Sequence, residues 1–187
     1  NVGKASSETA SNYHTSTIGS PVLAVHDSVD AKRVLLTFDS GVPTAVFDTL
    51  RICGISDIAG NIAECLRFPF CNYKARAYDV VIDEIMADPD PPYGLPQAEY
   101  VELFNRTCFP VKMKDWQFEF SSSRKQLPDI AIGAFGFVTL SKGTMFSIFG
   151  PTIDLFTSSS SLANEGTTLV LKDNEGRVIH TVSYSSG

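Results

Sequence analysis

The chain has 187 residues, 43% of them hydrophobic and 11% aromatic, and this length fits two small domains better than one large domain at about 100–200 residues each. The net charge of −6, with the basic residues scattered, argues against nucleic acid as a partner, because phosphate binding uses clustered Lys and Arg. The longest apolar run, residues 130–140, is shorter than the ~20 residues of a membrane-spanning helix, so no transmembrane segment is expected.

The N-terminal part changes character near residue 20. Residues 1–20 are rich in Ser and Thr and have few apolar anchors, so at least the first ten are expected to be loose, with Tyr13 opening the ordered part. After them come short apolar stretches bounded by Asp, Ser, Gly or Pro, at Pro21–His26, Arg33–Phe38 and Thr49–Ile55. Short strands at this spacing predict a β-sandwich.

Three stretches of this first part carry a family resemblance: NY at 12–13, VLLTFDSGV at 34–42 and LRICGISDIAGNIAE at 50–64. Together they are similar to the closing half of a bacterial immunoglobulin-like domain, in which Asp57, Gly60 and Asn61 match the turn before the last strand. The resemblance implies further strands before Asn12. It predicts a first module over residues 1–78 that is truncated and has an exposed or patched edge.

The four cysteines stand at positions 53, 65, 71 and 108. A hairpin turn over residues 56–61, centred on Ala59, would place Cys53 and Cys65 opposite each other on paired strands, which predicts a disulfide between them. Cys71 and Cys108 are left as a possible second bridge between the join and the second module. An even count, in families usually found outside the cell, favours an oxidising compartment.

The join between the modules, residues 67–78, is aromatic rather than rich in Gly and Ser. Phe68, Phe70, Tyr73 and Tyr78 are costly to leave in water. We therefore expect this join to be packed and to hold the two modules in a fixed relation.

The next stretch has an ambiguous period. Val80 to Ala87 is rich in β-branched residues and ends at a crossing, residues 88–96, with four prolines and a glycine. In the residues that follow, 98–105, the apolar side chains together fit one face of a helix. They fit a strand if Val101 and Leu103 alternate with Glu102. The residue pattern alone leaves both open.

The C-terminal part predicts further strands. Trp116, Phe118 and Phe120 alternate with polar residues, which indicates an aromatic row in a core rather than a platform for sugars. Residues 173–176 predict a hairpin with a bulged turn. The apolar run of Phe135, Phe137, Met145, Phe146, Ile148 and Phe149 is expected in the core, and residues 157–161 form a polar loop.

Four motifs in this order resemble the lamin tail domain: VVIDEIMADP…EYVELFNRT, DWQFEF, FVTLS and TLVLKDNEGRVIHTVSY. They look like the bacterial, secreted branch of that immunoglobulin-like family and cover roughly residues 79–185. The resemblance implies an all-β chain with two immunoglobulin-like sandwiches, the second over residues 79–187. It also implies adhesion, docking or accessory binding, with no catalytic residues to carry over.

Within such a sandwich the ambiguous stretch is a strand. Val101 and Leu103 should then face the core, and Glu102 should point outward with Tyr100 and Phe104. The sequon that starts at Asn105 is expected to be unused, because it lies inside the motif and a bacterial chain would not use it.

The search for chemistry gives mostly negative results. His14, His26 and His180 form no zinc-spaced pair and no triad, and no phosphate-binding glycine loop is present. Asp88 and Asp90 supply at most two ligands of a calcium site. No catalytic, metal or cofactor site is therefore predicted. One set of carboxylates gathers around the same predicted hairpin and is tested against the structure below: Asp83, Glu84, Asp88, Asp90, Glu99 and Glu102.

These observations predict a non-catalytic pair of modules that is secreted or attached to the bacterial outer surface, is monomeric, and binds a protein or a glycan. The alternative is an accessory region of a secreted hydrolase whose catalytic domain lies elsewhere in the parent protein. The start at Asn1 without methionine and the stop at Gly187 suggest a trimmed fragment of that parent. Glu84 and Glu102 are the likeliest exceptions to the absence of catalysis.

Overall fold

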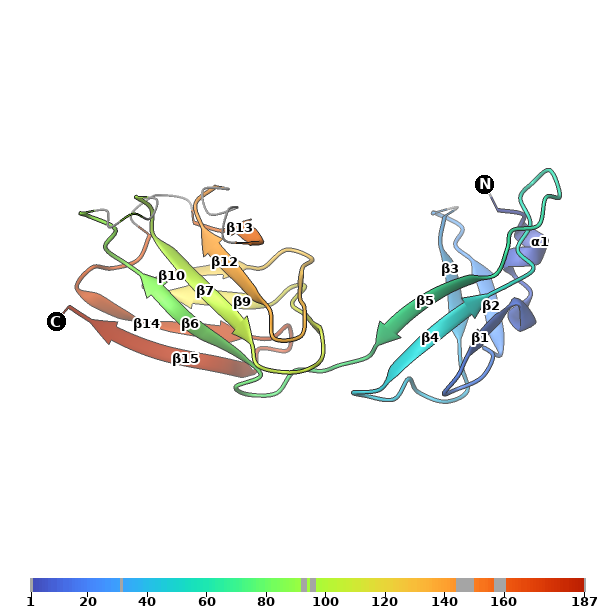
Figure 1. Ribbon diagram of the computed structural model, residues 1–187, viewed down its shortest axis with the longest axis horizontal. Helices are drawn as coiled ribbons and strands as arrows, with labels where there is room; N and C mark the ends of the chain where they lie inside the picture. Colours follow the sequence, from blue (N-terminus) through green and yellow to red (C-terminus); the bar gives the residue numbers. More distant parts are fainter. Residues whose placement is uncertain are drawn as a thin grey trace. The chain divides into compact units, whose positions relative to one another are not determined.

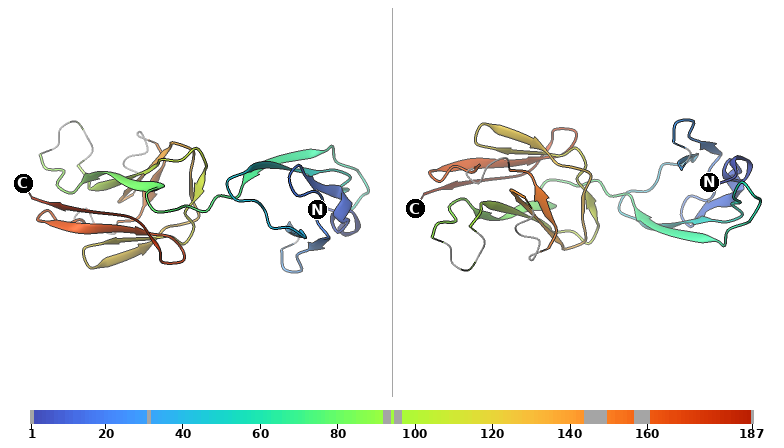
Figure 2. Two further views of the ribbon diagram at one scale, coloured as in Figure 1. Left: turned by 90° about the horizontal axis from the view of Figure 1, so that it is seen from below. Right: turned by 90° about the horizontal axis from the view of Figure 1, so that it is seen from above.

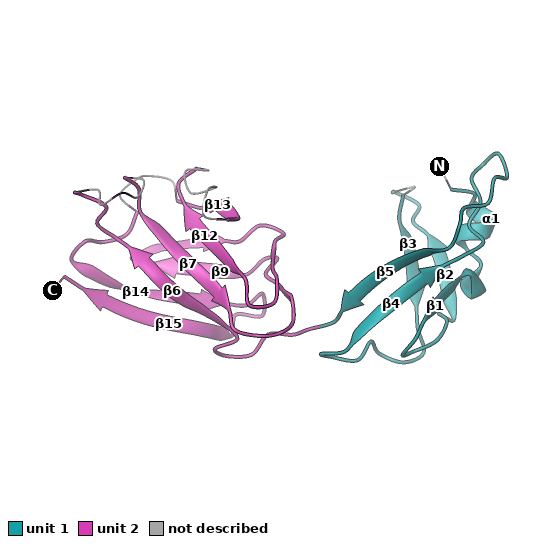
Figure 3. Ribbon diagram, in the orientation of Figure 1, with its two compact units in different colours: residues 1–72 teal, residues 73–187 magenta. Residues whose placement is uncertain are grey.

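A computed structural model describes residues 2–30, 32–91, 94, 97–143, 150–156 and 161–186. The chain divides into two compact units, unit 1 (Asn1–Asn72) and unit 2 (Tyr73–Gly187), shown in Figure 3. The regular secondary structure of both is almost entirely short strands, which confirms the all-β prediction.

The structure divides the two units between Asn72 and Tyr73. The boundary predicted from the sequence lies after residue 78. The Tyr73 ring stacks on Phe109 with 4.8 Å between ring centroids, and its hydroxyl donates to Asp79 at 2.7 Å. Burial, followed by this hydrogen bond to a carboxylate, raises the pKa of Tyr73 to about 12. The residues of the aromatic join are thus divided between the units. Phe68 and Phe70 belong to a strand of unit 1, and Tyr73 belongs to unit 2.

Among the described residues, unit 1 contains a three-stranded sheet, ordered β1-β4-β5, and a β2-β3 hairpin (Figure 1). A single helical turn and a 3₁₀ turn precede them. The bounds are α1 Lys4–Ser7, the 3₁₀ turn Ala10–Asn12, β1 Tyr13–Thr15, β2 Leu23–His26, β3 Val34–Thr37, β4 Phe47–Ile52 and β5 Leu66–Cys71.

The N-terminal segment is ordered, contrary to the expectation from its composition. The Gly3 amide donates to the Ser56 carbonyl at 2.6 Å, and the Ser56 amide donates to the Ser6 hydroxyl at 3.0 Å. The Tyr13 hydroxyl donates to the Ser7 carbonyl at 2.8 Å, and its ring is buried. Small polar residues anchor this segment by hydrogen bonds to the backbone, and a count of apolar anchors does not register such bonds.

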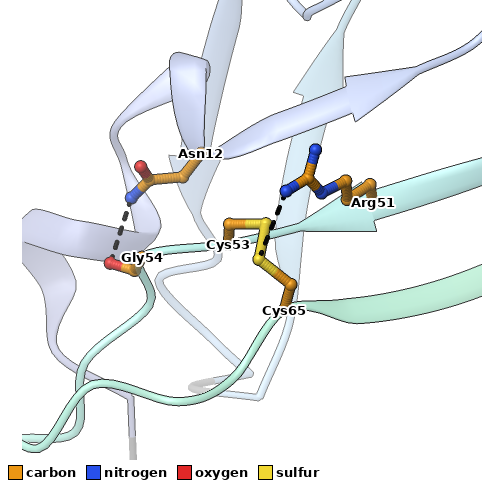
Figure 4. Close-up of a disulfide and its surroundings, with 5 residues drawn as sticks. All are labelled: Asn12, Arg51, Cys53, Gly54 and Cys65. Carbon is orange, nitrogen blue, oxygen red and sulfur yellow. Dashed lines mark hydrogen bonds between the residues drawn. A yellow bond between two sulfur atoms is a disulfide. The ribbon is translucent and has the colours of Figure 1, made fainter.

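The β4–β5 hairpin is centred on residue 59. Ile52 pairs with Leu66, and the next position in this register places Cys53 opposite Cys65. The structure joins these two cysteines by a disulfide with a Cα–Cα distance of 4.3 Å (Figure 4). The predicted Cys71–Cys108 bridge would link the two units and stays a prediction.

The tip of this hairpin is closed by Asp57. One of its carboxylate oxygens accepts from the amides of Ala59 and Asn61 at 2.8 and 2.9 Å, and the other accepts from the Asn61 side chain at 2.9 Å. Gly60 has φ +88, a backbone conformation that favours glycine. The three residues matched by the first resemblance therefore form one turn.

Unit 1 buries few apolar side chains. Among its described residues, Tyr13 and Ala24 are the buried hydrophobic residues. Its exposed large hydrophobic residues include Val22, Leu23, Val25, Val29, Leu35, Phe47, Ile58, Ile62, Leu66 and Phe68. Unit 1 therefore exposes more large hydrophobic residues than it buries.

In the described part of unit 2, two four-stranded sheets have the orders β13-β12-β7-β6 and β10-β9-β14-β15, with a smaller β11-β8 pair. The strands of this unit are seen from two further sides in Figure 2. The ambiguous stretch is a strand, β7. The bounds are β6 Val80–Met86, β7 Tyr100–Asn105, β8 Val111–Lys112, β9 Gln117–Phe120, β10 Ser123–Gln126, β11 Ala131–Ile132, β12 Phe137–Ser141, β13 Thr152–Asp154, β14 Gly166–Lys172 and β15 Val178–Ser185.

The core of unit 2 draws on both four-stranded sheets. Trp116, Phe118 and Phe120 are all buried, which confirms the predicted aromatic row. Val101 and Leu103 of β7 are fully buried as expected. The register of the β14–β15 hairpin shifts at residues 171–172, next to a turn with Gly176 at φ +80, so the bulged turn is also confirmed.

The prediction that the apolar run from Phe135 to Phe149 lies in the core is wrong for its first two members. Phe135 is 59% exposed and Phe137 is 43% exposed. Phe135 lies in a turn with φ +52, and Phe137 points away from the core while its neighbour Val138 points in. The remaining members, Met145 to Phe149, lie outside the described residues, as does most of the polar loop at 157–161.

Candidate functional site

One side of the β13-β12-β7-β6 sheet faces away from the core. Successive side chains of a strand point to opposite sides, so burial of Val101 and Leu103 places their neighbours on this outer side. We call its central part the aromatic–acidic face and define it by five residues: Val81, Glu84, Glu102, Phe104 and Phe137.

The aromatic half of this face is a row across three strands. Val81 pairs with Phe104, and Phe104 pairs with Phe137. The two phenyl rings are stacked, with centroids 4.5 Å apart and 21° between their planes. Because Phe104 and Phe137 are partly exposed, the pair offers an apolar surface on a rigid sheet.

The acidic half is the next row. Glu84 of β6 lies directly opposite Glu102 of β7, and like charges in this position repel. Burial, then the charges of Glu84 and Asp83, raise the pKa of Glu102 above its usual value. Within the described part of the chain, neither glutamate forms an ion pair with a cation.

Tyr100 points to the outer side with Glu102, as expected, but it is covered there. Its ring is 7% exposed and packs with Ala98 and Met86. Its hydroxyl donates a hydrogen bond to a Glu84 carboxylate oxygen. Burial, and then this bond, raise the pKa of Tyr100, which keeps the hydroxyl protonated as a donor.

A β-bulge orients Glu84. The register of β6 against β7 shifts between Ile82 and Glu84, so Asp83 is the extra residue. The Ile82 amide donates to Nδ1 of His180 on β15, at 3.0 Å. Burial, then the charge of Arg106, lower the pKa of His180 and favour the neutral ring that can accept this bond.

The other carboxylates of the predicted set have different surroundings. Glu99 is buried and accepts from the amides of Ser161 and Leu162, the latter at 2.9 Å. The Asp90 amide donates to Asp88 at 3.4 Å, and part of the crossing that follows lies outside the described residues. Among the residues that the structure describes, no group of three or more His, Cys, Asp or Glu is placed to hold a metal.

Asn105, the first residue of the sequon, is fully buried. Its side-chain amide donates to the carbonyls of Phe109 and Gly133, both at 2.8 Å. A glycan-bearing asparagine must reach solvent, so this one has a structural role: it ties the end of β7 to the turn before β12.

The comparison with family models settles what unit 2 is. Residues 74–186 match the Lamin Tail Domain model. The chain belongs to the lamin tail domain family. No curated protein gives a significant match to it. In this lamin tail domain, the aromatic–acidic face lies on the strands that carry the first of the four sequence motifs, together with β12.

Two observations bear on what the lamin tail domain and its neighbour do chemically. A cavity of about 550 Å³ is lined by unit 1 residues, Ile55 and Ile62 among them, and not by Glu84 or Glu102. Glu84 is exposed and Glu102 is half-buried on the outer side of the sheet. No described helix is long and apolar enough to cross a membrane.

Proposed function

We propose that this chain is a non-catalytic binding protein in which the aromatic–acidic face of the lamin tail domain docks a protein partner. The observation that carries the proposal is the stacked Phe104–Phe137 pair, exposed next to Glu84 and Glu102. This surface combines apolar rings with carboxylates that have no cationic partner among the described residues, so a cation from another protein could pair with them.

The partner chemistry follows from this surface. A Lys or Arg side chain carries an apolar stem that packs on phenyl rings and a charged head that pairs with carboxylates. Its arrival would relieve the repulsion between Glu84 and Glu102. The partner is therefore a protein that presents a basic residue beside an apolar one. The chain is proposed to act as a monomer that meets this partner with one face.

The absence of catalysis is part of the proposal. Glu84 and Glu102 are the best candidates for acid–base chemistry, and Glu84 is exposed while Glu102 is half-buried rather than enclosed. A screen for glycosidase, phosphatase, nuclease and esterase turnover should read background. Turnover that disappears in a folded Glu102→Gln variant would contradict this.

We also propose that the chain works outside a bacterial cell, secreted or held at the outer surface. The Cys53–Cys65 disulfide supports this, because such bridges persist in oxidising compartments. Fractionation of cells that express the protein should place it outside the cytoplasm. Recovery from the cytoplasm with Cys53 and Cys65 reduced would contradict the assignment.

Unit 1 is proposed to be the closing part of a bacterial immunoglobulin-like domain. The Asp57 turn and the excess of exposed apolar residues support this reading. Amide hydrogens of β2 and β3 should exchange faster than those of β7, because an incomplete sandwich leaves its strands weakly covered. Exchange of β2 and β3 as slow as that of β7 would contradict it.

The docking proposal is tested by selecting random displayed peptides on the immobilised chain. The selected peptides should combine Lys or Arg with an apolar neighbour and should lose binding to Phe137→Ser. Val178→Ser is the matched control, because it removes another half-exposed hydrophobic residue of the same unit, on β15. Equal losses in both variants would contradict the proposed face.

A further inference from the structure

A row of basic side chains crosses the three-stranded sheet of unit 1. His14 of β1 pairs with Arg51 of β4, and Arg51 pairs with Arg67 of β5. All three residues are exposed. We call them the basic row. The chain positions are far apart, so scanning the sequence for basic runs does not find them.

The basic row lies on the outer side of this sheet. Tyr13 and Thr15, the neighbours of His14, are buried and therefore point to the inner side. The other outer-side positions follow from the register. They are Phe47, Thr49, Pro69 and Cys71, none of them acidic.

The basic row differs from several other arginines of the chain in its charge balance. Arg33, Arg124 and Arg177 each lie against a carboxylate, at 3.8, 2.9 and 2.6 Å respectively. Within the described ranges, no member of the basic row forms an ion pair. Two arginines directly opposite each other repel, so the sheet carries a cost that an anion would remove.

The row is also held in position. A guanidinium nitrogen of Arg51 donates to Sγ of Cys65 at 3.7 Å, beside the disulfide (Figure 4). His14 Nδ1 lies 3.4 Å from the Ser20 hydroxyl. Neighbouring strands are about 4.8 Å apart, so the three basic side chains leave the sheet from adjacent backbone positions.

From these contacts we infer that the basic row binds an anionic polysaccharide, one whose sugars carry carboxylate or sulfate groups. Guanidinium groups bind such oxyanions in a bidentate manner. Phe47, 61% exposed on the same side, adds a ring surface of the kind on which sugars stack. Nucleic acid fits less well, because a protein of net charge −6 with two arginines in this row neutralises few phosphates. The basic row belongs to unit 1 and shares no residue with the aromatic–acidic face of unit 2.

The test is binding of the intact chain to immobilised dextran sulfate, alginate and neutral dextran. The sulfated polymer, the carboxylated polymer or both should bind in a salt-sensitive way, and neutral dextran should not. Which of the two binds identifies the anionic group. Arg51→Gln and Arg67→Gln should each weaken binding about tenfold, the size of one charge-assisted contact.

Arg124→Gln is the matched control, since it removes the same charge from unit 2. It should change binding less than about twofold, because the net charge has only a screened, long-range effect. Circular dichroism checks that each variant is folded, and the two row variants test the site independently. The inference is overturned by no binding to either anionic polymer, by a double variant that binds as tightly as wild type, by an equal loss in Arg124→Gln, or by tighter binding to duplex DNA.

Discussion

Asn105 accepts two hydrogen bonds from Thr107, one from its amide at 3.0 Å and one from its hydroxyl at 2.8 Å. The two residues that define a glycosylation sequon are therefore bonded to each other inside the lamin tail domain. The polar capacity of the Asn105 side chain is met by protein groups, and its surface is fully buried.

We predict that Asn105→Ala lowers the free energy of unfolding of the lamin tail domain by about 3 kcal/mol, because it removes the donor to the buried Ile132 carbonyl and the acceptor of the Thr107 amide. Urea unfolding followed by fluorescence of Trp116 measures the change. Thr107→Val should cost less, about 1 kcal/mol, since it removes one hydroxyl. A loss below about 1 kcal/mol in Asn105→Ala would show that these bonds do not hold the loop.

The second prediction concerns the Cys53–Cys65 bridge, which closes a loop at a sequence separation of 12. Replacing both cysteines by serine should lower the stability of unit 1 by about 3 kcal/mol, because the unfolded chain regains its freedom. Thermal unfolding of the variant measures the loss. Peptide mapping without reductant should recover Cys53 joined to Cys65. A peptide joining Cys53 to Cys71, or Cys65 to Cys108, contradicts the pairing.

Asp48 gives unit 1 a sensitivity to acid. Its carboxylate accepts from the Ser16 amide and hydroxyl at 3.0 and 2.9 Å, and from the Thr17 amide at 3.1 Å. Burial alone would raise its pKa, but these bonds and one from the Thr49 amide outweigh burial and hold the pKa well below its usual value.

A carboxylate whose pKa is lowered on folding stabilises the folded state above its unfolded pKa, and this contribution is lost as the pH falls. We predict that Asp48→Asn lowers stability at pH 7 by about 2 kcal/mol. The difference from wild type should shrink as the pH falls below 3.8, the ordinary value for Asp. Urea unfolding of unit 1 at several pH values measures it. A difference independent of pH would contradict the role of the charge.

Ionisation of Glu102 should have the opposite effect on stability to ionisation of Asp48. Its pKa is raised on folding, so its ionisation costs stability, and that cost appears as the pH rises above 4.5, the ordinary value for Glu. We predict that Glu102→Gln stabilises the lamin tail domain at pH 7 by up to about 1 kcal/mol and has less effect at pH 4. Glu175→Gln, a change on the exposed β14–β15 turn, is the control. Destabilisation by Glu102→Gln at pH 7 would show that the pair is not repulsive.

Much of the fold could be predicted from local patterns and from resemblance. The alternation of Trp116, Phe118 and Phe120 identifies a buried strand face, because a period of two has one structural meaning. The residue pattern of β7 fits both a helix and a strand, and the resemblance to the lamin tail domain was needed to assign it as a strand. The hairpin centre at Ala59 follows from the turn residues around it, and with it the opposition of Cys53 and Cys65.

The parts that could not be predicted depend on contacts distant in sequence. Tyr100 follows the strand alternation but is buried, because Ala98 and Met86 pack on its ring. The N-terminal segment is ordered by hydrogen bonds to Ser56, which composition does not register. The row of His14, Arg51 and Arg67 exists only once three strands are paired in register.

The central claim is that the aromatic–acidic face of the lamin tail domain is where a partner docks. The most direct measurement is an amide chemical-shift titration of the ¹⁵N-labelled chain with a peptide chosen by the display selection. We predict that the shifts concentrate on β6, β7 and β12 around Phe104, Phe137 and Glu102, and that Phe137→Ser abolishes them. Shifts confined to β9, β10 and β14, or shifts that persist in Phe137→Ser, would contradict the claim.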